Sequence, residues 1–330
     1  MNKEARYWTP LEGKRVQCLL CPNQCVIASG KVGRCLGRKN IDGKLYAVNY
    51  GEVVSMAVDP IEKKPLYHYY PGAEIFSVAT YGCNLLCPFC QNWEISQEIA
   101  PSRFISPQEL LKTVKRSGVN LISYTYSEPL VWFEFLLDAG KLLKDAGIKN
   151  VLVTNGMINP EPLREILPLI DAMNIDLKSI REGFYRDYIK GDLPTVLETI
   201  RIAHKNCHIE LTNLIIPGRN DSEAEIRELV DFVASLGRKT PLHFSRYFPR
   251  HRASEPVTPT ETLRRAAEIA REKLDYVYLG NIAIGERYQN TFCPGCGAVL
   301  VDRSGYVGRL VGLKDGECQR CGRKADIVLC

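Results

Sequence analysis

Three closely spaced cysteines are the residues of this chain best suited to chemistry. Cys83, Cys87 and Cys90 lie within eight residues, with x3 and x2 spacing, and the next cysteine is Cys207. Tetrahedral zinc and ordinary iron–sulfur clusters take four protein ligands. Three thiolates therefore predict a [4Fe–4S] cluster with one iron left open to a substrate. The alternative is a redox-inert buried trio or part of a disulfide set.

A second group of cysteines lies near the beginning of the chain. Its members are Cys18, Cys21, Cys25 and Cys35. Four thiolates at this spacing fit either zinc or an auxiliary iron–sulfur cluster, and ligand softness does not separate the two. Zinc is the simpler interpretation. Few large apolar residues surround the group, so we expect that either metal would be needed to fold it.

A third group forms two CxxC pairs near the end of the chain. The pairs are Cys293 with Cys296 and Cys318 with Cys321, and the sequence between them is glycine-rich and strand-like. This pattern is typical of a zinc ribbon. Four thiolates leave no open position on the metal, so we expect structural zinc rather than a catalytic one.

Composition narrows the class of protein further. The 330 residues are 45% hydrophobic and 25% charged, with 13 cysteines and a formal net charge of +5. This charge is mild and spread along the chain, so it is weak evidence for nucleic-acid binding. The first residues lack an apolar signal region, and no apolar run is long enough to span a membrane. We therefore expect a cytoplasmic protein, in which cysteines bind metal rather than form disulfides.

From residue 75 onward, strand-like and helix-like segments alternate. The expected strands are 75–80, 121–126, 151–154, 173–178, 208–216 and 242–248, with a further strand-like segment at 276–279. The expected helices are 107–117, 129–145, 162–170, 196–205, 222–236 and 261–273, two of them capped by Ser106 and Ser222. This alternation predicts parallel strands with helices outside. Polar residues at the carboxyl ends of the strands favour a partial (β/α)6 barrel with its site at that rim.

These patterns divide the chain into four expected parts. They are a four-cysteine head at 1–45, a connecting segment at 46–72, the barrel at 73–287 and a zinc-ribbon-like tail at 288–330.

The end of the second expected strand is the first part of the rim. It carries Thr125, Tyr126, Ser127 and Glu128, followed by Pro129. Their backbone groups and the Glu128 carboxylate are suited to hold an ammonium group. The alternative is that Ser127 and the acid only cap the following helix.

The next two strands continue the rim. Thr154 and Asn155 follow the third strand, where they either form a turn or contact a ribose or carboxylate. Asn174, Asp176 and Lys178 alternate on the fourth, so they share one face. The alternative for Asp176 and Lys178 is a plain ion pair in a polar barrel interior.

The fifth and sixth strands carry more polar residues. Thr212 and Asn213 extend the inward-facing set, and His243 fits a satisfied core residue better than a catalyst. The basic stretch 246–252 fits an anion site and a solvated loop equally well.

These motifs together resemble the radical SAM superfamily, in particular the pyruvate formate-lyase activating enzymes. Cys83, Cys87 and Cys90 match its cluster motif, and residues 125–129 occupy the place of the segment that receives the amino group of S-adenosylmethionine. The resemblance implies that Thr154, Asn155, Asp176 and Lys178 also contact this cofactor. Val153 replaces the first acid of the cation site found in those activases, while Asp176 remains.

Over nearly the whole chain, the sequence is similar to the group called AmmeMemoRadiSam system radical SAM proteins. Cys18-x-x-Cys21-Pro, residues 59–68 and 87–96 and the terminal CxxC pairs carry the similarity. The resemblance implies an electron donor of the flavodoxin or ferredoxin type, and as partners the two protein families with which this group is associated. It does not fix a substrate.

The resulting hypothesis is an oxidoreductase that cleaves S-adenosylmethionine reductively and abstracts hydrogen from a substrate. A narrower form is an activase that abstracts hydrogen from a protein glycine. The alternative from another class is a non-enzymatic module that binds zinc and nucleic acid. Against it, no stretch of the sequence interleaves basic and stacking aromatic residues.

Overall fold

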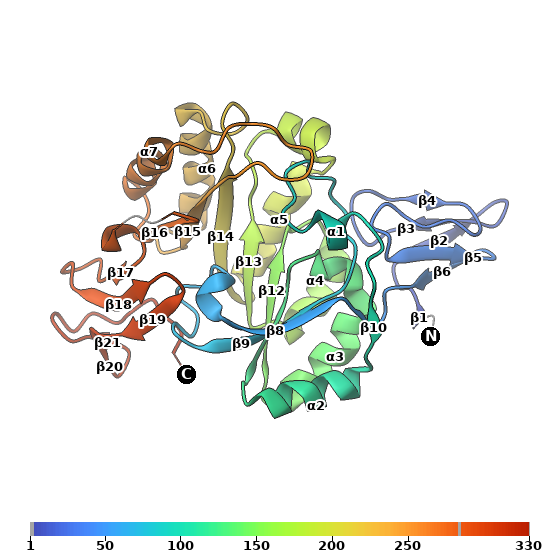
Figure 1. Cartoon of the computed structure of the whole chain (residues 1–330), viewed down its shortest axis with the longest axis horizontal. Helices are drawn as coiled ribbons and strands as arrows, with labels where there is room; N and C mark the ends of the chain where they lie inside the picture. Colours follow the sequence, from blue (N-terminus) through green and yellow to red (C-terminus); the bar gives the residue numbers. More distant parts are fainter. Residues whose placement is uncertain (1–2, 283–284, 330) are drawn as a thin grey trace.

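The computed structural model describes residues 3–282 and 285–329, and a large twisted sheet forms its centre (Figure 1). Eight strands follow the order β16-β15-β14-β13-β12-β11-β9-β8. Seven of them run parallel: β9 (Glu74–Ala79), β11 (Leu121–Tyr124), β12 (Lys149–Thr154), β13 (Ala172–Asp176), β14 (His208–Ile215), β15 (Leu242–Arg246) and β16 (Val277–Gly280). The eighth, β8 (Ser55–Pro60), pairs antiparallel with β9 at the edge.

One longer α-helix lies in each connection between consecutive parallel strands. These helices are α2 (Pro107–Ser117), α3 (Phe133–Asp145), α4 (Pro160–Ile166), α5 (Leu193–His204), α6 (Glu223–Leu236) and α7 (Thr260–Arg271). Their apolar faces and the buried strand residues form one large core. The predicted β/α alternation and open barrel are confirmed, β16 matches the strand-like segment expected at 276–279, and β8 adds an antiparallel edge strand.

Local chemistry explains where the helices begin and end. Ser106 caps α2, where its hydroxyl accepts from the Glu109 amide at 3.2 Å. The helix predicted over 162–170 stops at Ile166 and continues as the 3-10 turn η3 (Leu167–Leu169), because Pro168 has no N–H to donate. The helix predicted over 129–145 likewise begins with the 3-10 turn η2 (Pro129–Trp132) before α3.

The N-terminal residues form two small antiparallel sheets beside the barrel (Figure 1). The strands are β1 (Lys3–Glu4), β2 (Trp8–Leu11), β3 (Arg15–Cys18), β4 (Val26–Ile27), β5 (Arg38–Ile41) and β6 (Lys44–Ala47). In the following segment, β7 (Glu52–Val53) pairs with β10 (Arg103–Phe104), and β8 joins the main sheet. The segment predicted as a connection at 46–72 is therefore partly built into the barrel.

The C-terminal residues form small sheets at the opposite side of the main sheet (Figure 1). The strands are β17 (Thr291–Phe292), β18 (Val299–Ser304), β19 (Val307–Leu310), β20 (Leu313–Lys314) and β21 (Glu317–Cys318), after the short turn η5 (Glu286–Tyr288). Among the described residues, no helix is both long and apolar enough to cross a membrane.

A buried polar network joins this tail to the amino-terminal half of the barrel. Glu210 on β14 accepts hydrogen bonds from the His68 amide at 2.7 Å and pairs with His243 of β15 at 2.7 Å. The ring of His68 contacts the Tyr278 hydroxyl at 2.6 Å and the Asp326 carbonyl at 2.7 Å. His243 is thus a satisfied core residue, as the sequence favoured.

Candidate functional site

The loop after β9 carries Cys83, Cys87 and Cys90 at the carboxyl edge of the sheet. The Cys83 sulfur accepts from the Leu85 amide at 3.4 Å and from the Asn155 side chain at 3.5 Å. Burial raises the pKa of Cys87 to about 12, against the pull of the Lys178 ammonium. Because such buried thiols hold their protons, a metal is needed to convert them to thiolates. Three thiols in one loop, with two N–H donors to the sulfur of Cys83, fit a cluster that is held at three irons.

The turn after β11 packs directly against this cysteine loop. The Glu128 amide donates to the Gly82 carbonyl at 3.2 Å, and the Ser127 hydroxyl donates to the Thr80 carbonyl at 2.6 Å. Ser127 therefore does not cap the following helix, contrary to the alternative drawn from the sequence. Glu128 does so, because its carboxylate accepts from the Leu130 amide at 3.0 Å. Thr125, its neighbour in the turn, is also buried.

Glu128 connects the end of β11 to the end of β12 through hydrogen bonds. Its carboxylate accepts from the Thr154 hydroxyl at 2.6 Å and from the Asn155 amide at 2.8 Å. Burial raises the pKa of Glu128 to about 7, although these hydrogen bonds act in the opposite direction. Glu128 thus orients Asn155, whose side chain reaches both Cys83 and the Asn84 side chain.

The fourth strand brings an ion pair to the same edge. Lys178 lies just beyond β13, and its ammonium is 2.9 Å from the Asp176 carboxylate. Burial opposes the Lys178 charge, but Asp176 outweighs it and raises the lysine pKa. The Lys178 amide donates to the Tyr185 hydroxyl at 3.0 Å. Tyr185 belongs to a π-helical turn, η4 (Phe184–Ile189), a feature often found at functional sites.

Asn174 and the fifth strand lie deeper in the barrel. The Asn174 side chain donates to the Pro65 carbonyl at 2.8 Å and accepts from the Thr212 hydroxyl at 3.0 Å. Asn213 donates to the Leu177 carbonyl at 2.8 Å. All three polar side chains are satisfied within the protein, so they stabilise the barrel interior rather than offer free groups.

The basic stretch after β15 covers the cysteine loop. The Arg252 amide donates to the Pro88 carbonyl at 2.8 Å, and the His251 ring stacks on Trp93 of the short helix α1 (Trp93–Ser96). Arg246 instead donates to the Thr258 carbonyl at 2.8 Å. This stretch is therefore a cover over the loop that carries Cys87 and Cys90.

One polar cluster was not recognised in the sequence. The Lys64 ammonium is fully buried, 2.7 Å from the Asp59 carboxylate, and Asp59 also accepts from the Tyr126 hydroxyl. Burial opposes ionisation of Asp59, but hydrogen bonds from Lys63, Lys64 and Tyr126 hold its pKa well below the usual range. The side chain of Tyr126 therefore points to Asp59, while its carbonyl accepts from Asn92 at 2.8 Å. The signal for this cluster in the sequence is the run of charged residues at 59–64.

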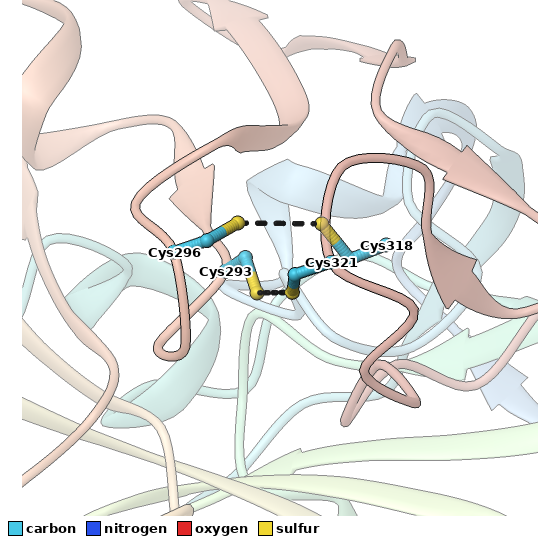
Figure 2. A group of neighbouring side chains, drawn as sticks. All are labelled: Cys293, Cys296, Cys318 and Cys321. Atoms are coloured by element: carbon cyan, nitrogen blue, oxygen red, sulfur yellow. Dashed lines mark hydrogen bonds between the residues drawn. The ribbon is translucent and has the colours of Figure 1, made fainter.

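The four C-terminal cysteines converge on one point (Figure 2). Cys293 and Cys321 have sulfurs 3.6 Å apart, as do Cys296 and Cys318, and all four sulfurs lie within 4.8 Å of one another. A Zn–S distance of about 2.3 Å places the sulfurs of a tetrahedral site about 3.8 Å apart. This spacing fits a single metal ion, as the sequence predicted.

The four N-terminal cysteines also come together, around a small buried space. Its lining includes Cys18, Cys21, Cys25 and Cys35. The structure thus joins three cysteines that precede β4 with Cys35 of the connection between β4 and β5.

Comparisons with known proteins identify the family. Residues 77–233 match the radical SAM superfamily. The chain is 44% identical to the uncharacterized protein MJ0808 of Methanocaldococcus jannaschii, over 99% of this chain and 100% of the relative. It is 27% identical to a pyruvate formate-lyase-activating enzyme of Clostridium pasteurianum, over 47% of this chain and 67% of the relative. A radical SAM methyltransferase of Sphaerobacter thermophilus shares the fold with a TM-score of 0.50 and 15% identity, over 64% of this chain and 67% of that one.

The parallel barrel and the cysteine loop at its carboxyl edge define an iron–sulfur enzyme of the radical type. The chain belongs to the radical SAM superfamily. It is homologous to pyruvate formate-lyase activating enzymes over 47% of its length.

Proposed function

We propose that this protein is a radical SAM enzyme that cleaves S-adenosylmethionine reductively and abstracts hydrogen from a substrate at the barrel mouth. The observation that carries the proposal is the three-cysteine loop, with Cys87 buried and Cys83 and Cys90 half-buried, which the ends of β11, β12 and β13 surround. Family membership supports the enzyme over the alternative of a zinc and nucleic-acid binding module.

Cys83, Cys87 and Cys90 would hold a [4Fe–4S] cluster at three of its irons. When bound, this cluster supplies the electron that splits the sulfonium into methionine and a 5′-deoxyadenosyl radical. The protein contributes position and exclusion of water. The cover at 246–252 lies over the loop and limits access of solvent to it.

The rim residues would hold S-adenosylmethionine in different ways. Carbonyl and hydroxyl oxygens of residues 125–127 are suited to its ammonium group, and Lys178 is suited to its carboxylate or ribose. Glu128 acts as a positioning residue, because its carboxylate already accepts from Thr154 and Asn155. Asp176 fixes Lys178 through their 2.9 Å ion pair.

The test is turnover under anaerobic conditions. Iron-loaded protein with dithionite and S-adenosylmethionine should form 5′-deoxyadenosine and methionine. The variant Cys87→Ala should lose both products, whereas Cys207→Ala, a cysteine outside the three groups, should keep them. Unchanged turnover in Cys87→Ala would sink the assignment.

A narrower candidate is an activase for a glycyl radical enzyme. The homology to a pyruvate formate-lyase-activating enzyme favours it. Electron paramagnetic resonance of reaction mixtures with co-encoded proteins decides this point. A glycyl doublet supports the activase, and its absence with every such protein counts against it.

The resemblance to the AmmeMemoRadiSam group supports a cytoplasmic enzyme that works with a flavodoxin- or ferredoxin-type donor. Proteins of the two associated families are then the first substrates and partners to test. Pull-down under anaerobic conditions with each co-encoded protein would measure this association.

A further inference from the structure

The N-terminal cysteine cavity lies directly against the loop of Cys83. An added Cβ on Gly82 would come within 2.2 Å of the Cys35 carbonyl, so the two backbones touch where only glycine fits. Asn23 donates to the Asn84 carbonyl at 2.8 Å. The two cysteine groups are thus separated by a few bonded and hydrogen-bonded atoms.

Asn84 connects the two groups most directly. Its side chain accepts from Asn155 at 2.9 Å, and Asn155 also donates to the Cys83 sulfur at 3.5 Å. On its other side, the Asn84 side chain donates to the Met157 carbonyl at 2.6 Å, while the Asn84 backbone carbonyl accepts from Asn23, two residues from Cys21. Asn84 therefore links the Cys83 loop to the segment that carries Cys21.

The spacing of the N-terminal thiols differs from that of the zinc-like C-terminal group. All four N-terminal cysteines are described, yet none of their sulfurs makes a sulfur–sulfur contact like the 3.6 Å pairs at Cys293–Cys321. They instead surround a space lined by Leu20, Ile27 and Val131. Thiols that face a shared space suit a multi-iron cluster better than a single ion.

A buried cation faces the same space. Arg38 lines the cavity with an exposed fraction of 1%, and one of its terminal nitrogens pairs with Glu134 at 2.6 Å. Among the described atoms, its Nε and other terminal nitrogen have no hydrogen-bond partner. Unpartnered N–H donors beside four thiolates are suited to bind the sulfur atoms of a cluster, an interaction that adjusts its reduction potential.

The surface of the head has the charge expected at a docking site for an acidic protein. Apart from the buried Arg38, residues 3–45 contain eight Lys or Arg and three Asp or Glu, while the whole chain has a net charge of only +5. Lys14, Arg15, Lys31 and Arg34 are exposed. A positive surface raises the rate of encounter with an acidic donor.

We propose that Cys18, Cys21, Cys25 and Cys35 bind a second [4Fe–4S] cluster that relays electrons from an acidic donor protein to the cluster at Cys83. The claim that electrons pass to the Cys83 site (the relay half) rests on the proposed function. The claim that the four N-terminal cysteines bind a cluster (the binding half) does not. One electron leaves the reduced donor and reduces the head cluster, which returns to its oxidised state as the electron passes to the Cys83 site. No bond or proton changes place.

Metal analysis and spectroscopy of the anaerobically purified full chain test the binding half. Wild-type protein should contain the iron of two clusters and one zinc. After reduction, paramagnetic resonance should show two cluster signals, of which S-adenosylmethionine changes one. Iron for one cluster together with two zincs would overturn the proposal, and this measurement needs no variant.

Variants assign each signal to its cysteines. In Cys21→Ser with Cys35→Ser, we expect half the iron to be lost, with the zinc and the S-adenosylmethionine-sensitive signal retained. Halved zinc with unchanged iron would instead show a zinc site. In Cys87→Ser with Cys90→Ser, the other half of the iron should be lost. If no signal responds to S-adenosylmethionine but the head cluster is present, the proposed function fails and the binding half stands.

Reduction kinetics test the relay half. With flavodoxin hydroquinone as donor, reduction of the Cys83 cluster should slow at least tenfold in Cys21→Ser with Cys35→Ser, and wild-type reduction should slow as salt rises. Reduction by dithionite, which reaches clusters directly, should keep its rate. Equal flavodoxin rates in the two proteins would overturn the relay.

Discussion

Replacement of His68 by asparagine should flatten the response of stability to pH between pH 7.5 and pH 5. His68 is fully buried, with Nδ1 2.7 Å from the Asp326 carbonyl and Nε2 2.6 Å from the Tyr278 hydroxyl. A neutral ring satisfies both contacts, since Nδ1–H donates to the carbonyl and Nε2 accepts from the hydroxyl. A second ring proton would face the Tyr278 donor and force it to turn away.

The magnitude follows from the difference in proton binding between the folded and unfolded chains. Burial lowers the pKa of His68 to about 4, against the carboxylate of Glu210, which raises it. The unfolded pKa is about 6.5, so the unfolded chain binds more protons and stability falls as pH falls below it. Integrated from pH 7.5 to pH 5, this amounts to about 2 kcal/mol. Glu210 takes up its proton only at lower pH. Burial raises the pKa of this carboxyl, but hydrogen bonds from His208 and His243 hold it well below the ordinary value.

The assay is the urea midpoint of the metal-loaded protein at several pH values. Wild type should lose about 2 kcal/mol from pH 7.5 to pH 5 through this one group. His68→Asn keeps a donor toward Asp326, and its stability should change much less over the same range. His204→Asn, at an exposed position, is the control and should follow wild type. Equal pH slopes in His68→Asn and wild type would refute the assignment of a buried neutral ring.

Three further outcomes are expected. Arg38→Met should leave Glu134 as an unpaired buried charge and cost about 3–5 kcal/mol, seen as a lower urea midpoint. Arg227→Met, at the exposed pair with Glu272, is the control and should cost under about 1 kcal/mol. Cys318→Ser should remove one zinc per chain and lower the melting temperature, since metal stabilises the small tail; zinc retained at full content would contradict this. Asn155→Ala should weaken S-adenosylmethionine binding about tenfold in calorimetry, through loss of a hydrogen bond worth ~1.5 kcal/mol, and unchanged affinity would exclude Asn155 from the site.

The elements of the barrel could be predicted because each depends on local pattern. Alternating strands and helices, the Ser106 cap and the three cysteine groups are all visible within short windows of sequence. The edge strand β8 was less visible, because its antiparallel pairing with β9 is set by the folded sheet rather than by its own pattern.

Contacts between distant residues could not be predicted from such windows. The His68 amide and the Glu210 carboxylate are 142 positions apart, and neither residue type predicts which residue it will contact. The same holds for Lys64 and Tyr126, which are 62 positions apart in the sequence and 3.4 Å apart in the fold. Ser127 was assigned as a possible cap from its residue type, but the adjacent carboxylate of Glu128 reached the Leu130 amide instead.

The two cysteine-rich ends of the chain lie at opposite ends of the barrel strands, and this separates what a metal bound at each would do. Gly82 and Asn84 bring the N-terminal cysteines against the carboxyl edge, where the Cys83 loop lies. Tyr278 and Glu210 connect the C-terminal residues to the amino-terminal half of the strands. A metal in the head is therefore placed to exchange electrons with the radical site. A metal in the tail is placed to stabilise the polar network at the amino-terminal half of the strands. Its removal should therefore lower the stability of the protein more than it changes electron transfer.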